Sequence, residues 1–254
     1  MKSLDKVLDI IEFLAINGHT GIREISAKLS VPPATVHRIV ASLNERGYLQ
    51  KKEDNQQYGL STKFLELGDA VQQQFDIVSI ARPFLEYLVD KTGENANLCI
   101  LNGWNSVYID HIHSQEHSLM LFTRLGAVAP LYASGVGKIF LSYFSTSKLK
   151  HYFNEVECIA YTDDTIITLA EMKLEIEKIQ QIGYAFDDEE KEKGVRCVAA
   201  PILDRKGENI AGISVSGATQ RISVKRLSQL GEIVKETAQQ LSGELGYGSP
   251  SLDL

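Results

Sequence analysis

The stretch "SVPPATVHRIVASLNERGYL", residues 30–49, restricts the possible folds of this chain more than any other part of the sequence. Proline disfavours helical geometry in the residue before it but is tolerated in the first turn of a helix. The Pro32-Pro33 pair therefore predicts a break between two helices, the second of which covers residues 33–46 and ends at Gly47. Four of its apolar residues share one face: Val36, Ile39, Val40 and Leu43. That face is expected to pack inward and the other to meet solvent.

Two amphipathic helices are predicted before this one. The first covers residues 4–14 with Ser3 as its N-cap, and the second lies in "TGIREISAKLSV", where Thr20 can act as the cap. A short helix, a tight turn and a second helix are typical of a helix-turn-helix, whose second helix enters the major groove of DNA. Three short helices alone also fit a plain packing unit with a solvated face.

The following residues favour DNA binding. "YLQKKEDNQQYGL" predicts two short strands, residues 48–52 and 56–60, around a polar turn, which completes the pattern of a winged helix. Arginine can pair with guanine or phosphate, hydroxyls can bond base edges, and lysines near a hairpin tip can meet the backbone. The residues expected to contact double-stranded DNA are Thr20, Pro33, Ala34, Thr35, His37, Arg38, Ser42, Lys51 and Lys52.

Charge is unevenly spread along the chain. The formal net charge is −7, yet residues 1–60 hold eight Lys/Arg and seven Asp/Glu. The acidic excess therefore lies in the remainder, and the first sixty residues are the part whose charge balance suits a polyanion.

The remaining residues predict a linker helix and a larger domain. Apolar spacing indicates a helix that ends at Gly93, then consecutive strands that include residues 118–126, then helices, a hairpin and a final helix over 224–245. This order predicts an α+β fold with an antiparallel sheet covered by helices. The expected domains are residues 1–60, a linker helix over 61–75, and residues 76–248. No apolar run approaches the roughly 20 residues that cross a bilayer, so we expect a cytoplasmic protein without a membrane partner.

The stretch "DDEEKEKGVRCVAAPILDRKGENIAGISVSG", residues 187–217, carries the candidate binding chemistry of the larger domain. Ser214 and Ser216 are two apart on a predicted strand and so share a face, which Cys197 can join if its strand pairs with theirs. The helix predicted after Ser134 offers backbone N–H groups to an anion. These groups fit a bound carboxylate; serines bonded to backbone and a merely buried cysteine are the alternative. Glu189, Glu190 and Glu192, with Lys191 and Lys193, are expected to form a solvated turn.

Catalysis, metal binding and a purely architectural role are the alternatives to ligand binding. Cys197 could act as a nucleophile only if His111, His113 or His117 lay close to it, and no GxSxG, Walker, GxGxxG or HExxH motif occurs. His111 and His113 are the densest set of possible metal ligands, and a pair of this kind is usually structural. We expect no enzyme, no metal and no cofactor. An architectural DNA-binding protein would not need a folded second domain of this size.

Four segments together resemble the IclR family of bacterial transcriptional regulators over essentially the whole chain: "GIREISAKLSVPPATVHRIVASLNERGYL", "YGLSTKFLELG", "RLGAVAPLYASGVGK" and "GYAFDDEEKEKGVRCVAAPILDRKGENIAGISVSG". The resemblance implies a winged-helix DNA-binding domain, a linker helix and a GAF-like effector and oligomerisation domain. It also implies dimers or tetramers on operator DNA and control by a small organic acid. The effector-binding residues carried over to this chain are Gly135, Val136, Asp187, Cys197, Ser214 and Ser216, with an apolar wall around residues 119–122.

Overall fold

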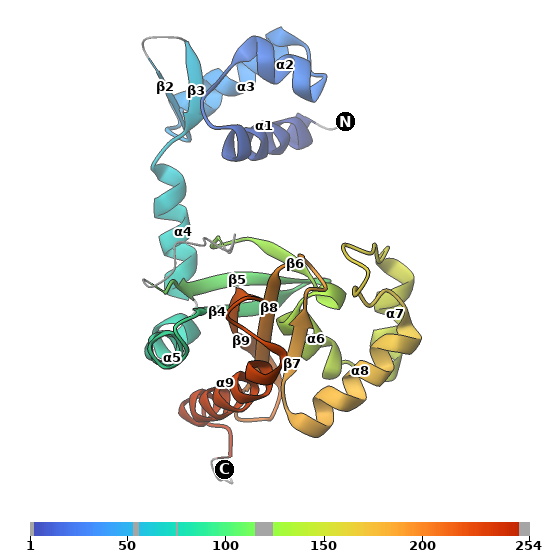
Figure 1. Ribbon diagram of the computed structural model, residues 1–254. Helices are drawn as coiled ribbons and strands as arrows, with labels where there is room; N and C mark the ends of the chain where they lie inside the picture. The colour runs from blue at the N-terminus through green and yellow to red at the C-terminus, as the bar shows by residue number, and fades with distance from the viewer. Residues whose placement is uncertain (1–2, 53–55, 75, 115–123, 249–254) are drawn as a thin grey trace. The chain divides into compact units, whose positions relative to one another are not determined.

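The computed structural model describes residues 3–52, 56–74, 76–114 and 124–248. The chain divides into two compact units, Met1–Phe75 and Asp76–Leu254 (Figure 1). In the described part, no helix is long and apolar enough to span a membrane. The apolar wall expected around 119–122 lies outside the described residues, as do residues 118–123 of the strand expected over 118–126. Residues 124–126 are not part of a strand.

The first unit has the helices and hairpin of a winged helix. Its elements are α1 Ser3–Asn17, β1 Thr20–Gly21, α2 Ile22–Leu29, α3 Pro33–Glu45, β2 Leu49–Lys51, β3 Gln57–Leu60 and α4 Lys63–Gln74. As predicted, α3 begins at Pro33, and it ends where Gly47 adopts a left-handed φ of 77°. There the N–H of Gly47 donates to the carbonyl of Asn44, and that of Tyr48 to Leu43. These bonds close the helix and turn the chain into β2.

Thr20 does not cap α2, so that prediction was wrong. The residue lies in β1, opposite Tyr58 of β3, and Gly21 takes the N-cap position without a side-chain bond. The Thr20 hydroxyl donates instead to the carbonyl of Gly18, at 3.2 Å, and the residue is only 3% exposed. Pairing with β3 holds this segment extended and turns Thr20 inward. A two-residue strand is too short to show the alternation by which strands are recognised.

The second unit is built on an antiparallel sheet of order β6-β5-β4-β9-β8-β7. Its elements are α5 Asp76–Thr92, β4 Asn95–Asn102, β5 Asn105–Ile112, β6 Val128–Pro130, α6 Gly135–Ser142, α7 Thr146–Glu155, α8 Leu169–Ile182, β7 Ala185–Asp188, β8 Val195–Leu203, β9 Asn209–Ala218 and α9 Val224–Glu244. The helix α6 packs on strands β7, β8 and β9, whereas α5 and α9 pack on each other and on β4, β8 and β9 (Figure 1). The α+β fold with a helix-covered antiparallel sheet is thus confirmed.

Local capping residues mark both ends of α8 and the start of α7. A capping box begins α8, where the Thr168 hydroxyl accepts from the N–H of Glu171 at 3.2 Å. That helix ends at Gly183, which has a left-handed φ of 86°. The helix α7 was not predicted from the sequence, although Ser145 caps it by accepting from the N–H of Lys148.

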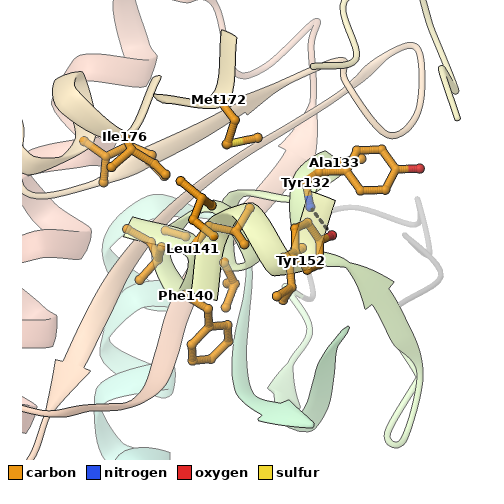
Figure 2. Packing of buried hydrophobic residues seen from close by; sticks show 14 of the residues in the cluster. Tyr132, Ala133, Phe140, Leu141, Tyr152, Met172 and Ile176 are labelled. Atoms are coloured by element: carbon orange, nitrogen blue, oxygen red, sulfur yellow. Dashed lines mark hydrogen bonds between the residues drawn. The ribbon is translucent and has the colours of Figure 1, made fainter. Parts of the chain in front are cut away.

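A hydrophobic cluster joins α6 to the helices α7 and α8 (Figure 2). Phe140 and Leu141 of α6 belong to the same cluster as Met172 and Ile176 of α8. Tyr152 of α7 is fully buried, and its hydroxyl accepts from the N–H of Tyr132 at 3.3 Å (Figure 2). This packing fixes the position of α6, whose first turn lines a cavity in the second unit.

Candidate functional site

The outer face of α3 carries most of the side chains expected to contact DNA. The exposed residues are Pro33, Ala34, His37, Arg38 and Ser42, and Thr35 is half-buried. The opposite face is buried in the unit through Val36, Ile39, Val40 and Leu43. This one-sided packing leaves the amino-terminal half of α3 accessible, as docking into a major groove requires.

Lys51 and Lys52 are exposed where β2 ends, and the Lys51 ammonium lies 5.9 Å from the ring centroid of Tyr58. Two cations next to the turn of the wing suit the sugar-phosphate backbone. Thr20 does not belong with these side chains, because it is buried beside β3.

In the second unit, a cavity of about 200 Å³ brings together every residue expected to bind an effector. These are Gly135, Val136, Asp187, Cys197, Ser214 and Ser216. Further lining residues that the sequence reasoning did not select are Tyr108, Ala127, Val128, Ala129, Ser134, Lys191, Glu192 and Val195. They come from β5, the segment of β6, the N-cap of α6, the turn after β7 and the start of β8. Apart from Ser134, at the start of a predicted helix, no local motif marks them as pocket residues.

The strand register explains why the polar residues meet. Asp187 of β7 lies opposite Cys197 of β8, which in turn lies opposite Ser216 of β9. Ser214 is two residues from Ser216 and so shares its face. That face is the one toward α6, because a Cβ added to Gly212, two residues further along, would lie 2.6 Å from Val136. The predicted same-face placement of Cys197 with the two serines is therefore confirmed.

The first turn of α6 forms the opposite wall. Ser134 is its N-cap, and its hydroxyl accepts from the N–H of Gly137 at 3.2 Å. Helix geometry leaves the N–H groups of Gly135 and Val136 without a partner inside the helix, at its partially positive end. A side chain at position 137 would come within 2.3 Å of the Leu131 carbonyl, so only glycine permits this approach. The turn thus presents donors to an anion in the cavity.

Asp187 is the titratable group of the cavity. It is 4% exposed, and its carboxylate accepts from the N–H groups of Glu190 at 2.9 Å and Lys191 at 3.4 Å. Burial, reinforced by the carboxylate of Glu190, raises the pKa of Asp187 to about 7, against the opposing effect of Lys138. A protonated Asp187 donates a hydrogen bond, so near neutral pH it can face a ligand carboxylate without repulsion.

The turn after β7 is not wholly solvated, so the prediction for Glu190 was wrong. Glu190 is 6% exposed, and its carboxylate lies 2.5 Å from the ammonium of the fully buried Lys138. The same ammonium lies 3.1 Å from Glu175 of α8. Burial lowers the pKa of Lys138, but the two carboxylates outweigh it and raise that pKa overall, which keeps the ammonium charged. The partner cation lies on α6, far away in sequence, so local charge alternation could not reveal it.

Hydroxyls from residues 162–165 also hold this turn. The hydroxyl of Thr162 donates to the carbonyl of Glu189 at 2.7 Å, and that of Thr165 to the carbonyl of Glu190 at 2.6 Å. Lys191, which lines the cavity, has its ammonium 3.7 Å from the ring centroid of Tyr161. The cavity wall is therefore tied to α6, α8 and the segment before α8.

Cys197 lacks the environment of a catalytic thiol. Burial and the nearby Asp187 raise the pKa of Cys197 far above its usual range, against hydrogen bonding from Ser216, which lowers it. A reactive cysteine needs the opposite shift. Within the described ranges, no group of three or more His, Cys, Asp or Glu residues could hold a metal ion; His117 lies outside those ranges.

A winged-helix unit followed by an α+β unit with a polar cavity defines a helix-turn-helix transcriptional regulator. Residues 3–53 match the IclR helix-turn-helix domain, and residues 69–243 match the family described as bacterial transcriptional regulator IclR, C-terminal. The chain belongs to the IclR family of bacterial transcriptional regulators, as its sequence motifs predicted. Its families and relatives are DNA-binding regulators and not enzymes.

Relatives and solved structures agree with this assignment. The chain is 36% identical to the HTH-type transcriptional regulator BhcR of Paracoccus denitrificans, over 95% of this chain and 86% of that protein. It is 31% identical to the regulator KdgR of Escherichia coli, over 97% and 94% of the two chains. The crystal structure of Thermotoga maritima IclR matches with a TM-score of 0.82 at 33% identity, covering 96% of this chain and 98% of the other.

Proposed function

We propose that this regulator binds operator DNA through α3 and the wing, and that a small organic acid in the cavity of the second unit controls its operator affinity. One observation carries the second part: hydroxyl, thiol and helix N-terminal donors line one cavity together with a carboxyl group whose pKa is about 7. Such a set of donors complements a carboxylate.

The DNA-binding part rests on the accessible face of α3. In this proposal Arg38 pairs with guanine or phosphate, Thr35 and Ser42 bond base edges or phosphates, and Ala34 permits close approach. Lys51 and Lys52 would neutralise backbone phosphates and make the affinity dependent on salt.

An effector can act only through different affinities for DNA-competent and DNA-incompetent arrangements. The helix α4 follows the wing in sequence and precedes the second unit, so we assign it the role of transmitting the signal.

Oligomer formation also belongs to the proposal. Large apolar side chains are exposed on α1 and α4, namely Leu4, Leu8, Ile16, Leu65 and Leu67. Exposed apolar side chains in such number favour a partner surface. A dimer or tetramer would place two copies of α3 on the two half-sites of an operator. Sedimentation velocity of the full chain measures this directly, and a monomer at micromolar concentration would contradict it.

The test of the effector uses the full chain in a thermal-shift screen against sugar acids, short oxo-acids and aromatic acids, each paired with its neutral amide. A ligand present at about 100 times its Kd stabilises the folded state by roughly 2.7 kcal/mol. We expect at least one acid to raise the melting temperature and to change affinity for DNA taken from upstream of the gene in a mobility shift. If every acid that binds leaves the DNA affinity unchanged, the proposal fails.

A further inference from the structure

Asn97 of β4 lies beside the cavity without lining it. Its register partner on β9 is Ser214, and it is fully buried. Its amide nitrogen donates to the hydroxyl oxygen of Ser214 at 3.3 Å and to that of Ser216 at 3.2 Å. Both N–H bonds of one amide are therefore directed at the two serines of the cavity wall.

These bonds restrict the directions in which the two serine hydroxyls can donate. A hydroxyl has one O–H donor and two lone pairs, and Asn97 uses a lone pair of each oxygen. The O–H bond of each serine must then point away from Asn97. Because both serines line the cavity, their protons become donors on its surface.

The amide adopts this orientation at a cost. Its Oδ1 atom is buried and has no hydrogen-bond partner among the described residues. An unpaired buried acceptor is unfavourable. The two bonds to the serines are thus the hydrogen bonds that orient this side chain.

We infer that Asn97 is a positioning residue that fixes the hydroxyls of Ser214 and Ser216 as donors, so that the cavity selects a carboxylate over a neutral amide of the same shape. The inference rests on the proposed function and extends it from a binding site to the origin of its selectivity. An amide group presents N–H donors of its own, which would confront the two O–H donors.

The decisive variant is Asn97→Asp, in which the new carboxylate accepts both serine protons and turns the serine lone pairs toward the cavity. Asn95→Asp is the matched control. It adds the same charge on the same strand and face, opposite Ser216, and keeps the Oδ1 atom that accepts from the N–H of Ser114 at 2.9 Å. Asn97→Ala removes the two donors without adding charge and serves if the first variant does not fold.

The probes are lactate and lactamide, titrated calorimetrically into the full-length protein. We expect wild type and Asn95→Asp to prefer lactate. Asn97→Asp should lower the lactate-to-lactamide affinity ratio at least tenfold relative to Asn95→Asp, and Asn97→Ala should lower it by a smaller factor. A general loss of packing would weaken both probes alike. Equal ratios in all four proteins would overturn the inference.

A second readout needs no ligand and separates failure of this inference from failure of the proposed function. When no acid is bound, the Ser216 hydroxyl donates to the sulfur of Cys197 and so favours its thiolate. Alkylation of Cys197 by iodoacetamide, followed by peptide mass spectrometry between pH 7 and 10, should be severalfold slower in Asn97→Asp than in Asn95→Asp. If lactate binds no form of the protein, a slower rate still supports the role of Asn97, and equal rates refute it.

Discussion

The ammonium of Lys138 lies 2.5 Å from the carboxylate of Glu190, and both side chains are buried. Lys138 is on the same helix as Gly135 and Val136, and Glu190 is on the turn that follows Asp187. One ion pair thus joins two walls of the cavity. Because the pair is buried, removing either partner should strongly destabilise the second unit.

Replacing Lys138 with Met should destabilise the second unit by about 3–5 kcal/mol, because it leaves the buried carboxylate of Glu190 and the partly buried one of Glu175 without this cation. Trp104, the single tryptophan of the chain, packs against the cluster around α6 and reports unfolding of that unit by fluorescence. Lys178→Met is the control, since this exposed lysine also pairs with Glu175, at 3.4 Å, and such pairs contribute under about 1 kcal/mol. Similar urea midpoints for the two variants would refute the prediction.

Binding of an acid effector should weaken as the pH rises through about 7. The pKa of Asp187 is raised by burial and by Glu190, so its protonated form, which can donate to a carboxylate, is lost above that value. One linked proton gives at most about a tenfold loss of affinity per pH unit. Calorimetry from pH 5.5 to 8.5 measures the slope, and Asp187→Asn should remove it. An unchanged slope in that variant would assign the proton to another group.

The free energy of unfolding should also decrease as the pH rises, because of the same group. The folded pKa of Asp187 lies above its unfolded value, so the folded state holds this proton more tightly, and the stability it contributes at low pH is lost as pH rises from about 4 to 7. Asp187→Asn should flatten that part of the pH profile of the melting temperature. Identical profiles for wild type and variant would contradict the shift.

The double variant Ser214→Ala with Ser216→Ala should lose binding of an acid effector by at least tenfold while keeping its operator affinity. The hydroxyls are on the cavity wall, in the unit that does not contain α3. Thermal shifts and mobility shifts on the same preparation make the measurement. Retained ligand response would remove both serines from the site.

Arg38→Ala should weaken operator binding by about tenfold or more, since one base contact contributes roughly 1–3 kcal/mol of discrimination. The loss should be larger for operator than for unrelated DNA if Arg38 reads a base, and equal for both if it contacts phosphate. Lys150→Ala on the exposed side of α7 removes one positive charge in the second unit and serves as control. Titrations at fixed salt that show equal affinities for both variants would exclude Arg38 from the interface.

Gly137→Ala should destabilise the second unit by about 1–3 kcal/mol and weaken effector binding, because the added Cβ would overlap the backbone of Leu131. Gly243→Ala in α9 has no atom within 4 Å of the added Cβ and should be neutral or slightly stabilising. Urea unfolding followed through Trp104 distinguishes them. A Gly137→Ala protein with wild-type stability would show that the first turn of α6 can shift.

The sequence by itself determined the local features of this protein. Periodicity, prolines and glycines placed α3 and its ends, because these signals act within a few residues. Strand alternation also indicated that Ser214 and Ser216 share a face, which Cys197 joins if its strand pairs with theirs. Asp187 was assigned to the site by the resemblance to the IclR family.

Only the tertiary structure decided which polar residues are buried and what they bond. Thr20 turned inward because β1 pairs with β3, and Glu190 became buried because Lys138 reaches it from α6. The sequence around Asn97 does not indicate its hydrogen bonds, because its partner Ser214 is 117 residues away along the chain. Burial and charge pairing of this kind depend on packing between distant segments. A charged turn or a strand asparagine has the same local sequence pattern whether or not a distant residue contacts it.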